Sequence, residues 1–210
     1  DPELTFTVPK SVTAATGVDA LVHAIEVYTC KVTNPISQAL GARAMEIIVS
    51  SLPEAYRDGR NEEARYNMLL GSLLAGLCFG TADVAAVHCL AEALGGLYDT
   101  PHGVANAVFL PFVLKFNAEE NKAIHAKLAR YMKFATESDS DEKAVEQLIQ
   151  GIETFTRSLG IPKLKDLPGV RKKDFGKIVE LAMQNGSTPS NIRTVTAEDY
   201  LRILEEAYNA

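Results

Sequence analysis

The stretch AAVHCLAEALGGLYDTPHG, residues 85–103, contains two of the four histidines of the chain among small and apolar residues. Its apolar spacing predicts two consecutive helices separated by a turn at Pro101. His88 lies in the first helix and His102 begins the second. Glu92 follows His88 by one helical turn, so the two side chains are expected on the same helix face. Polar side chains that are buried in so apolar a region require hydrogen-bond partners or a bound ion.

Helix signals continue on both sides of this stretch. Asn34, Asn61 and Thr196 are suited to cap the helices that follow them, and Pro53 is expected to kink or divide its helix. We expect helices over residues 10–29, 35–58, 62–79, 84–98, 102–115, 118–135, 141–159, 173–184 and 197–208.

Strand signals are nearly absent. The segment LTFTV at residues 4–8 is the one short strand candidate, and residues 160–170 and 186–195 are predicted loops rich in Gly, Pro and polar residues. No repeat of fixed period occurs, which argues against a solenoid. The sequence therefore predicts an all-α, multi-helix bundle-like fold.

Composition limits the class of protein. The chain has 210 residues, is 47% hydrophobic and carries a net charge of −6, which suits one large domain or at most two small ones. A negative charge argues against nucleic acid and anionic membrane surfaces as partners. No apolar run approaches the roughly 20 residues that span a bilayer. The beginning of the chain does not resemble a signal peptide, although its first residue, Asp1, suggests that an N-terminal portion is missing.

The three cysteines, Cys30, Cys78 and Cys89, show no CxxC spacing. We therefore expect buried free thiols and a cytoplasmic location. The sequence also lacks a GxxxxGK[ST] phosphate loop, a GxGxxG motif after a strand, an HExxH motif and an ExxH pair. These absences predict that the chain has no nucleotide site of its own and is neither a zincin nor a ferritin-like di-iron protein.

The first predicted helix carries a second group of polar residues in an apolar setting. In TAATGVDALVHAIEVY, Asp19 and His23 are four residues apart and share a helix face that Glu26 continues. A surface ion pair, a hydrogen-bonded core pair and a metal site are all compatible with Asp19 and His23 alone. Glu26 is expected to be a packing residue or a partner of a ligand rather than a ligand.

Asp19, His23, His88 and His102 together favour a metal site. Each of these histidines taken singly is compatible with a buried or capping histidine, but all three lie in the most apolar helices of the chain. His125, by contrast, has charged neighbours and is expected to be an ordinary histidine on a helix face. One Asp and three His suit Fe²⁺ or Zn²⁺ better than Mg²⁺ or Ca²⁺, which prefer oxygen ligands.

These motifs carry a resemblance to a known family. The stretches DPELTFTVPKSVTAATGVDALVHAIEVY, NPISQALGARAMEII and VHCLAEALGGLYDTPHGVANAVFLP resemble the C-terminal half of the iron-containing (group III) alcohol dehydrogenases. The similarity is strongest over residues 1–117, and RTVTAEDYLRILEEAY at 193–208 resembles the end of the family's chains. The resemblance implies that residues 1–210 form a helical metal-binding catalytic domain of the dehydroquinate synthase-like type.

The resemblance also implies a ligand set and a reaction. In the family, Asp and His of the first motif and two His of the second hold the metal, and these match Asp19, His23, His88 and His102. The implied reaction is reversible hydride transfer between NAD(P) and a small alcohol or aldehyde whose oxygen binds Fe²⁺ or Zn²⁺. The family's N-terminal NAD(P)-binding α/β domain has no counterpart in these 210 residues, so the chain by itself is expected to be inactive. A homo-oligomer is implied for the complete enzyme.

Two positions depart from the family pattern. Glu92 stands where many members have a histidine near the nicotinamide, and Phe112 stands where a histidine is common. Glu92 could act in a proton relay or orient a ligand histidine, or it could form an ion pair on the helix face. Both departures make the identity of the substrate less certain than the binding of the metal.

Two alternatives to an alcohol dehydrogenase remain open from the sequence. One is a polyol dehydrogenase or maleylacetate-reductase-like relative, which the intact set of four ligands disfavours. The other is a non-catalytic helical domain that binds metal or mediates assembly.

Overall fold

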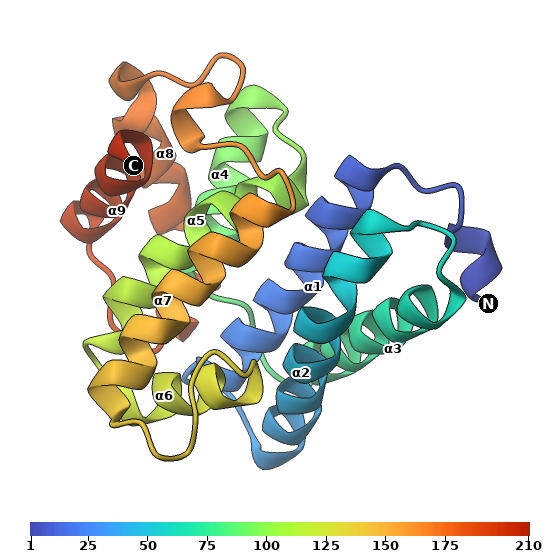
Figure 1. Cartoon of the computed structure of the whole chain (residues 1–210). Coiled ribbons are helices and arrows are strands. Elements are labelled where there is room, and N and C mark those ends of the chain that lie inside the picture. Colours follow the sequence, from blue (N-terminus) through green and yellow to red (C-terminus); the bar gives the residue numbers. More distant parts are fainter.

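The computed structural model describes residues 1–210, which form α-helices, short 3₁₀ helices and connecting turns without any strand (Figure 1). The 3₁₀ helices are η1 Pro2–Thr5, η2 Leu164–Asp166, η3 Lys172–Asp174 and η4 Thr188–Ser190. The α-helices are α1 Lys10–Thr29, α2 Pro35–Arg57, α3 Glu62–Phe79, α4 Ala86–Tyr98, α5 His102–Ala118, α6 Lys122–Tyr131, α7 Asp141–Ser158, α8 Phe175–Gln184 and α9 Ala197–Asn209. The all-α prediction is confirmed.

The two most extensively buried helices, α1 and α5, lie at the centre of the arrangement. On one side α1 packs against α2 and α3, and on the other side α5 packs against α4, α7 and α9 (Figure 1). The direct contact between α1 and α5 joins these two groups of helices. Because both helices have neighbours on several sides, they are apolar around most of their circumference rather than along one stripe.

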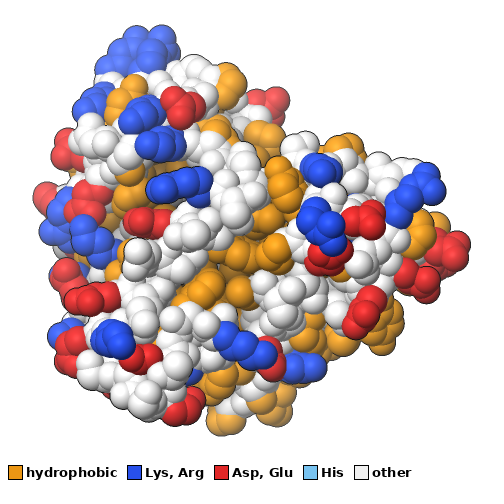
Figure 2. Space-filling model, viewed as in Figure 1, with side chains coloured by type: hydrophobic (Ala, Val, Ile, Leu, Met, Phe, Trp, Pro, Cys, Tyr) orange, Lys and Arg blue, Asp and Glu red, His pale blue; other side chains and the backbone are white.

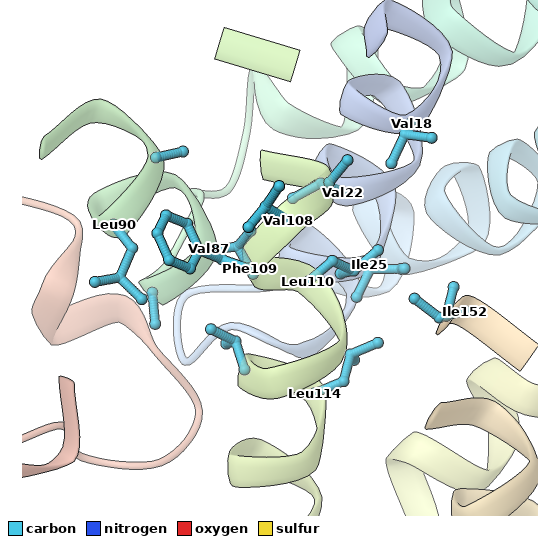
Figure 3. Close-up of a cluster of buried hydrophobic side chains, with 14 of the residues drawn as sticks. Val18, Val22, Ile25, Val87, Leu90, Val108, Phe109, Leu110, Leu114 and Ile152 are labelled. Atoms are coloured by element: carbon cyan, nitrogen blue, oxygen red, sulfur yellow. The ribbon is translucent and has the colours of Figure 1, made fainter. Parts of the chain in front are cut away.

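One hydrophobic core extends through the molecule. It contains 49 buried residues from both groups of helices. Figure 3 shows Val22 and Ile25 of α1 beside Val108 and Leu110 of α5, with Ile152 of α7 pointing toward the same region. The core therefore fixes α1 relative to α5, the two helices that carry Asp19, His23 and His102.

Gly103 allows α1 and α5 to approach closely. A Cβ atom at this position would lie 2.3 Å from the carbonyl oxygen of Ala15 and 3.3 Å from the Cβ of Asp19. Glycine is therefore required here by the space between the two helices. This close approach brings the beginning of α5, where His102 lies, onto the face of α1 that carries Asp19.

Three local predictions are wrong. Residues 4–8 form no strand, since the segment begins as η1 with Asp1 accepting a hydrogen bond from the backbone of Glu3. Of the two outcomes expected for Pro53, the division of its helix is wrong, because α2 continues from Pro35 to Arg57 while packed against α1 and α3. The predicted helix 118–135 is shorter: Asn121 caps α6, and the left-handed backbone of Lys133 (φ 59°) follows its end.

Other local predictions are confirmed. Asn34 and Asn61 accept backbone hydrogen bonds at the starts of α2 and α3, and Thr196 forms a capping box with Asp199 at the start of α9. No helix is long and apolar enough to cross a bilayer. The exposed surface mixes Lys, Arg, Asp and Glu with apolar side chains, as Figure 2 shows for one face. Helix α3 exposes an apolar row, namely Tyr66, Leu69, Leu73 and Leu77.

Candidate metal centre

Helix α1 presents Asp19 and His23 side by side. Both side chains are about a quarter exposed, at 24% and 22%. His23 Nδ1 lies 2.9 Å from the backbone oxygen of Asp19, to which it donates, so the neutral ring keeps a free electron pair on Nε2. Burial, followed by the nearby His88, lowers the pKa of His23. The ring is therefore neutral at neutral pH, as a metal ligand must be.

Helix α4 places His88 next to Asp19 and His23 of α1. The residue is 2% exposed. Its Nδ1 lies 2.6 Å from Oε2 of Glu26. Burial by itself lowers the pKa of His88, but the hydrogen bond and the charge of Glu26 outweigh burial and raise this pKa above its ordinary value.

His102 is the first residue of α5 and completes the set of four. Its Nε2 lies 3.4 Å from Oδ1 of Asp19, and its side chain is 46% exposed. The exposed ring marks the side on which the cluster opens to solvent. His102 therefore joins the cluster from the rim rather than from the core.

The four predicted residues are brought together by three helices. Ligand atoms of Asp19, His23 and His88 all lie within 4.8 Å of one another. The His88 ring centroid is 4.3 Å from that of His23 and 5.2 Å from that of His102. His88 Nε2 is 3.9 Å from Asp19 Oδ1. The two sequence motifs are more than sixty residues apart, so only the tertiary structure brings these four side chains together.

The chemistry of these groups fits a divalent first-row metal. His88 Nε2 is buried and has no hydrogen-bond partner, which is costly for a polar atom unless something else binds it. One carboxylate and three imidazoles are suitable ligands for Fe²⁺ or Zn²⁺. The exposed side chain of His102 places one edge of the cluster at the surface.

Two neighbours of the cluster were not identified from the sequence. Asn106 Nδ2 donates to Asp19 Oδ1 at 2.6 Å and lies 3.0 Å from His102 Nε2. Its position four residues after His102, in an otherwise apolar helix, is a signal that could have revealed it. Phe79, at the end of α3, packs edge-on against His23 with the ring centroids 5.5 Å apart. No spacing in the sequence indicated that contact.

Glu26 and Glu92 have different surroundings. Glu26 is 2% exposed and bonded to His88, which agrees with its expected role as the partner of a ligand. Glu92 is exposed, and its carboxylate accepts a hydrogen bond of 2.6 Å from Asn185. It forms no hydrogen bond with the four clustered residues and no ion pair with Lys or Arg, so neither orientation of a ligand histidine nor a surface ion pair is observed.

Two further predictions have clear outcomes. His125 is fully buried, with Nδ1 donating to the backbone oxygen of Asn121, so its expected place on an exposed helix face is wrong. The error arises because α6 packs against α7 and also contacts α1, α2 and α5, and these neighbours are not visible in the residues adjacent to His125 in the sequence. All three cysteines are buried and free, as predicted. Burial raises the pKa of Cys78 to about 11 and that of Cys89 to about 12.

Phe112 lies on a different surface. It lines a cavity of about 290 Å³ together with residues of α7 and of the segment that contains η2. None of the four clustered residues lines that cavity. Phe112 is therefore not a wall of the candidate metal centre in this chain.

The chain is thus an all-helical domain in which three helices bring one Asp and three His together. A family model for the C-terminal part of the Fe-containing alcohol dehydrogenase family matches residues 13–208. The chain belongs to the Fe-containing alcohol dehydrogenase family, as the sequence resemblance predicted.

Individual relatives agree with this assignment. The chain is 41% identical over 209 residues to 1,3-propanediol dehydrogenase of Citrobacter freundii, which covers 99% of this chain and 54% of that protein. The crystal structure of a 1,3-propanediol oxidoreductase superposes with a TM-score of 0.96 and 40% identity, over 99% of this chain and 54% of that one. Sulfoacetaldehyde reductase from Bifidobacterium kashiwanohense, solved with NAD⁺, has a TM-score of 0.89 and 27% identity, covering 99% and 53%. The chain thus spans about half the length of the relatives it matches.

Proposed function

We propose that residues 1–210 are the metal-binding catalytic part of an NAD(P)-dependent alcohol dehydrogenase that interconverts a small alcohol and its aldehyde. The observation that carries this proposal is the convergence of Asp19, His23 and His88 around the unpaired Nε2 of His88. His102 extends the cluster to its open side. Membership in the family supports hydride transfer as the reaction.

The side chains of this site have separate tasks in the proposal. Asp19, His23, His88 and His102 would hold Fe²⁺ or Zn²⁺. The bound ion supplies Lewis acidity toward an alcohol or aldehyde oxygen. Asn106 orients the Asp19 carboxylate through its 2.6 Å hydrogen bond. Phe79 covers one edge of His23 and limits the access of water there.

NAD(P) is expected to bind to another part of the complete protein. The chain carries neither a GxxxxGK[ST] nor a GxGxxG phosphate-binding motif, and it matches only about half of each relative. The half-exposed ring of His102 marks the face that the nicotinamide and the substrate would approach. Partners in this proposal are an N-terminal NAD(P)-binding domain and further copies of the complete chain.

The test compares two histidine variants of the full natural chain. His102→Ala removes an exposed candidate ligand, whereas His125→Ala removes the one histidine outside the cluster. Metal content is measured by elemental analysis, and hydride transfer by NAD(P)H absorbance with short-chain alcohols and aldehydes. We expect about one Fe²⁺ or Zn²⁺ per chain in the natural protein and in His125→Ala, and a loss of both metal and turnover in His102→Ala.

Three results would contradict the proposal. Metal bound without NAD(P)-linked activity in the full chain favours a non-catalytic metal-binding domain. Unchanged metal content and turnover in His102→Ala would show that His102 is not a metal ligand. Turnover by residues 1–210 alone would show that these residues bind NAD(P) without another part of the protein.

A further inference from the structure

Glu26 is a buried carboxylate whose three hydrogen bonds all go to one short segment. It lies on α1, one turn beyond His23, and is 2% exposed. Oε2 accepts from the backbone N–H of Ala85 at 2.9 Å and from His88 Nδ1 at 2.6 Å, while Oε1 accepts from the N–H of Val87 at 2.7 Å. A carboxylate is costly to bury unless such donors compensate for the lost water. The bonding therefore ties the C-terminal turn of α1 to the beginning of α4.

The beginning of α4 has no cap of its own. The first N–H groups of a helix lack partners within it and are usually satisfied by a Ser, Thr, Asp or Asn side chain. Ala85 stands at the cap position of α4 and offers no such group. Glu26 takes this role from a different helix, and its negative charge also suits the positive end of the helix dipole. The position of α4 along α1 is thereby fixed.

The third hydrogen bond selects the form of the His88 ring. Both oxygens of Glu26 accept from N–H groups, so Nδ1 of His88 carries the hydrogen in this pair. In the neutral ring Nε2 then bears the free electron pair. That atom is buried, has no other partner and lies 3.9 Å from Asp19 Oδ1. Glu26 thus keeps one nitrogen of His88 occupied and leaves the other directed into the cluster.

We propose that Glu26 is the positioning residue of the metal site: it caps α4 and holds the His88 ring in the tautomer and rotation that bind a divalent metal. This inference rests on the proposed function of Asp19, His23, His88 and His102 as ligands. Helix α1 then has two roles, since it supplies two ligands directly and orients a third through Glu26. Outer partners of this kind typically change metal affinity by about 10–100-fold when they are altered.

Glu26→Gln tests the proposal with almost no change in shape. All three partners of Glu26 are donors, but a glutamine amide offers one acceptor oxygen and one donor NH₂ group. Either a backbone N–H of α4 loses its partner or His88 Nδ1 becomes an acceptor, which places the hydrogen on Nε2. Glu26→Asp keeps the charge but shortens the side chain by one methylene. Asn61→Ala is the matched control, since it removes the side-chain cap of α3 without altering any of the four ligands.

The readouts are the dissociation constant for Zn²⁺, measured by competition with a chelator, and the visible spectrum of the Co²⁺-loaded protein. Both are recorded on the full natural chain. We expect affinity to fall about 10–100-fold in Glu26→Gln, with an altered Co²⁺ spectrum, and to fall less in Glu26→Asp. Asn61→Ala should lower the melting temperature and leave affinity within about twofold of the natural protein, because it removes a helix cap that is remote from the site.

The outcomes separate this inference from the proposed function. If the natural protein binds neither Zn²⁺ nor Co²⁺, the metal site itself is wrong. If it binds them and Glu26→Gln keeps the natural affinity and spectrum, Glu26 is only a helix cap and the inference is overturned. If Glu26→Gln does not fold, Glu26→Asp decides the question: a Zn²⁺ affinity equal to that of the natural protein would overturn the inference.

Discussion

Glu92 illustrates how one residue can share a helix face with a site and still not contact it. It lies one turn after His88, and its charge contributes to the raised pKa of that histidine. Its carboxylate, however, accepts a hydrogen bond from Asn185, which belongs to the segment following α8. The spacing predicted a side chain on the face of His88, but the observed partner belongs to a segment that no local pattern connects to α4.

We still propose Glu92 as a proton-relay residue, and one substitution tests this. Glu92→Gln keeps an oxygen that can accept from Asn185 but cannot take up a proton at neutral pH. Turnover of the complete enzyme should fall about 10²-fold or more, because general acid–base catalysis contributes on that order. Metal content, measured by elemental analysis, should not change. Unchanged turnover would rule out the relay.

Asp139, in the connection between α6 and α7, makes a pH-dependent contribution to stability. Its carboxylate accepts bonds from Lys143 Nζ at 2.6 Å and from the hydroxyl and backbone N–H of Thr136 at 2.7 and 2.9 Å. The hydrogen bond from Lys143, followed by those from Thr136, holds the pKa of Asp139 well below its ordinary value of 3.8. A pKa that is lower in the folded state gives stability that is present above the unfolded value and lost as the pH falls toward the folded value.

Asp139→Asn should therefore lower the thermal midpoint at pH 7, and its difference from the natural protein should shrink as the pH falls below about 4. Glu137→Gln is the control, because that side chain is 91% exposed and ion pairs at such positions contribute little. The measurement is the thermal unfolding midpoint at a series of pH values. A difference that stays constant down to pH 2 would show that ionisation of Asp139 plays no part.

At the scale of elements, the contact between α1 and α5 decides the shape of the metal centre. Gly103 lets the start of α5 lie against the backbone of α1 at Ala15. Gly76, in the exposed part of α3, has no neighbouring atom within 4 Å of the position of a Cβ. The same substitution is therefore expected to act in opposite directions at these two glycines.

Gly103→Ala should lower the free energy of unfolding by about 1–3 kcal/mol, because the new methyl group forces α1 and α5 apart. Gly76→Ala should raise it by about 0.5–1 kcal/mol, because alanine loses less entropy in a helix and meets no obstacle. Urea unfolding followed by circular dichroism measures both changes. Metal affinity should fall only in Gly103→Ala, and an unaltered stability in that variant would contradict the packing observed here.

At the scale of the whole molecule, one core joins helices from both ends of the sequence. Its 49 buried residues extend from Ala14 in α1 to Ala207 in α9. The apolar periodicity of the sequence predicted the helices that supply this core, and the caps at Asn34, Asn61 and Thr196 were predicted for the same local reason. Helix ends and short segments were predicted less well. Residues 4–8 and the limits of α6 depend on the caps Asp1 and Asn121 and on the left-handed backbone of Lys133, which apolar periodicity does not reveal. The continuity of α2 through Pro53 accompanies packing against α1 and α3.

The sequence by itself determined the all-α class, most of the helices, the three buried thiols and the identity of the four candidate ligands. It could do so because helix periodicity and polar residues in apolar helices are local properties. Only the tertiary structure decided that Glu26 caps α4 and orients His88, that Asn106 bonds Asp19, that Glu92 turns to Asn185 and that His125 is buried. Each of these depends on which helices pack together, and contacts between residues distant along the chain leave no periodic signal in a single sequence.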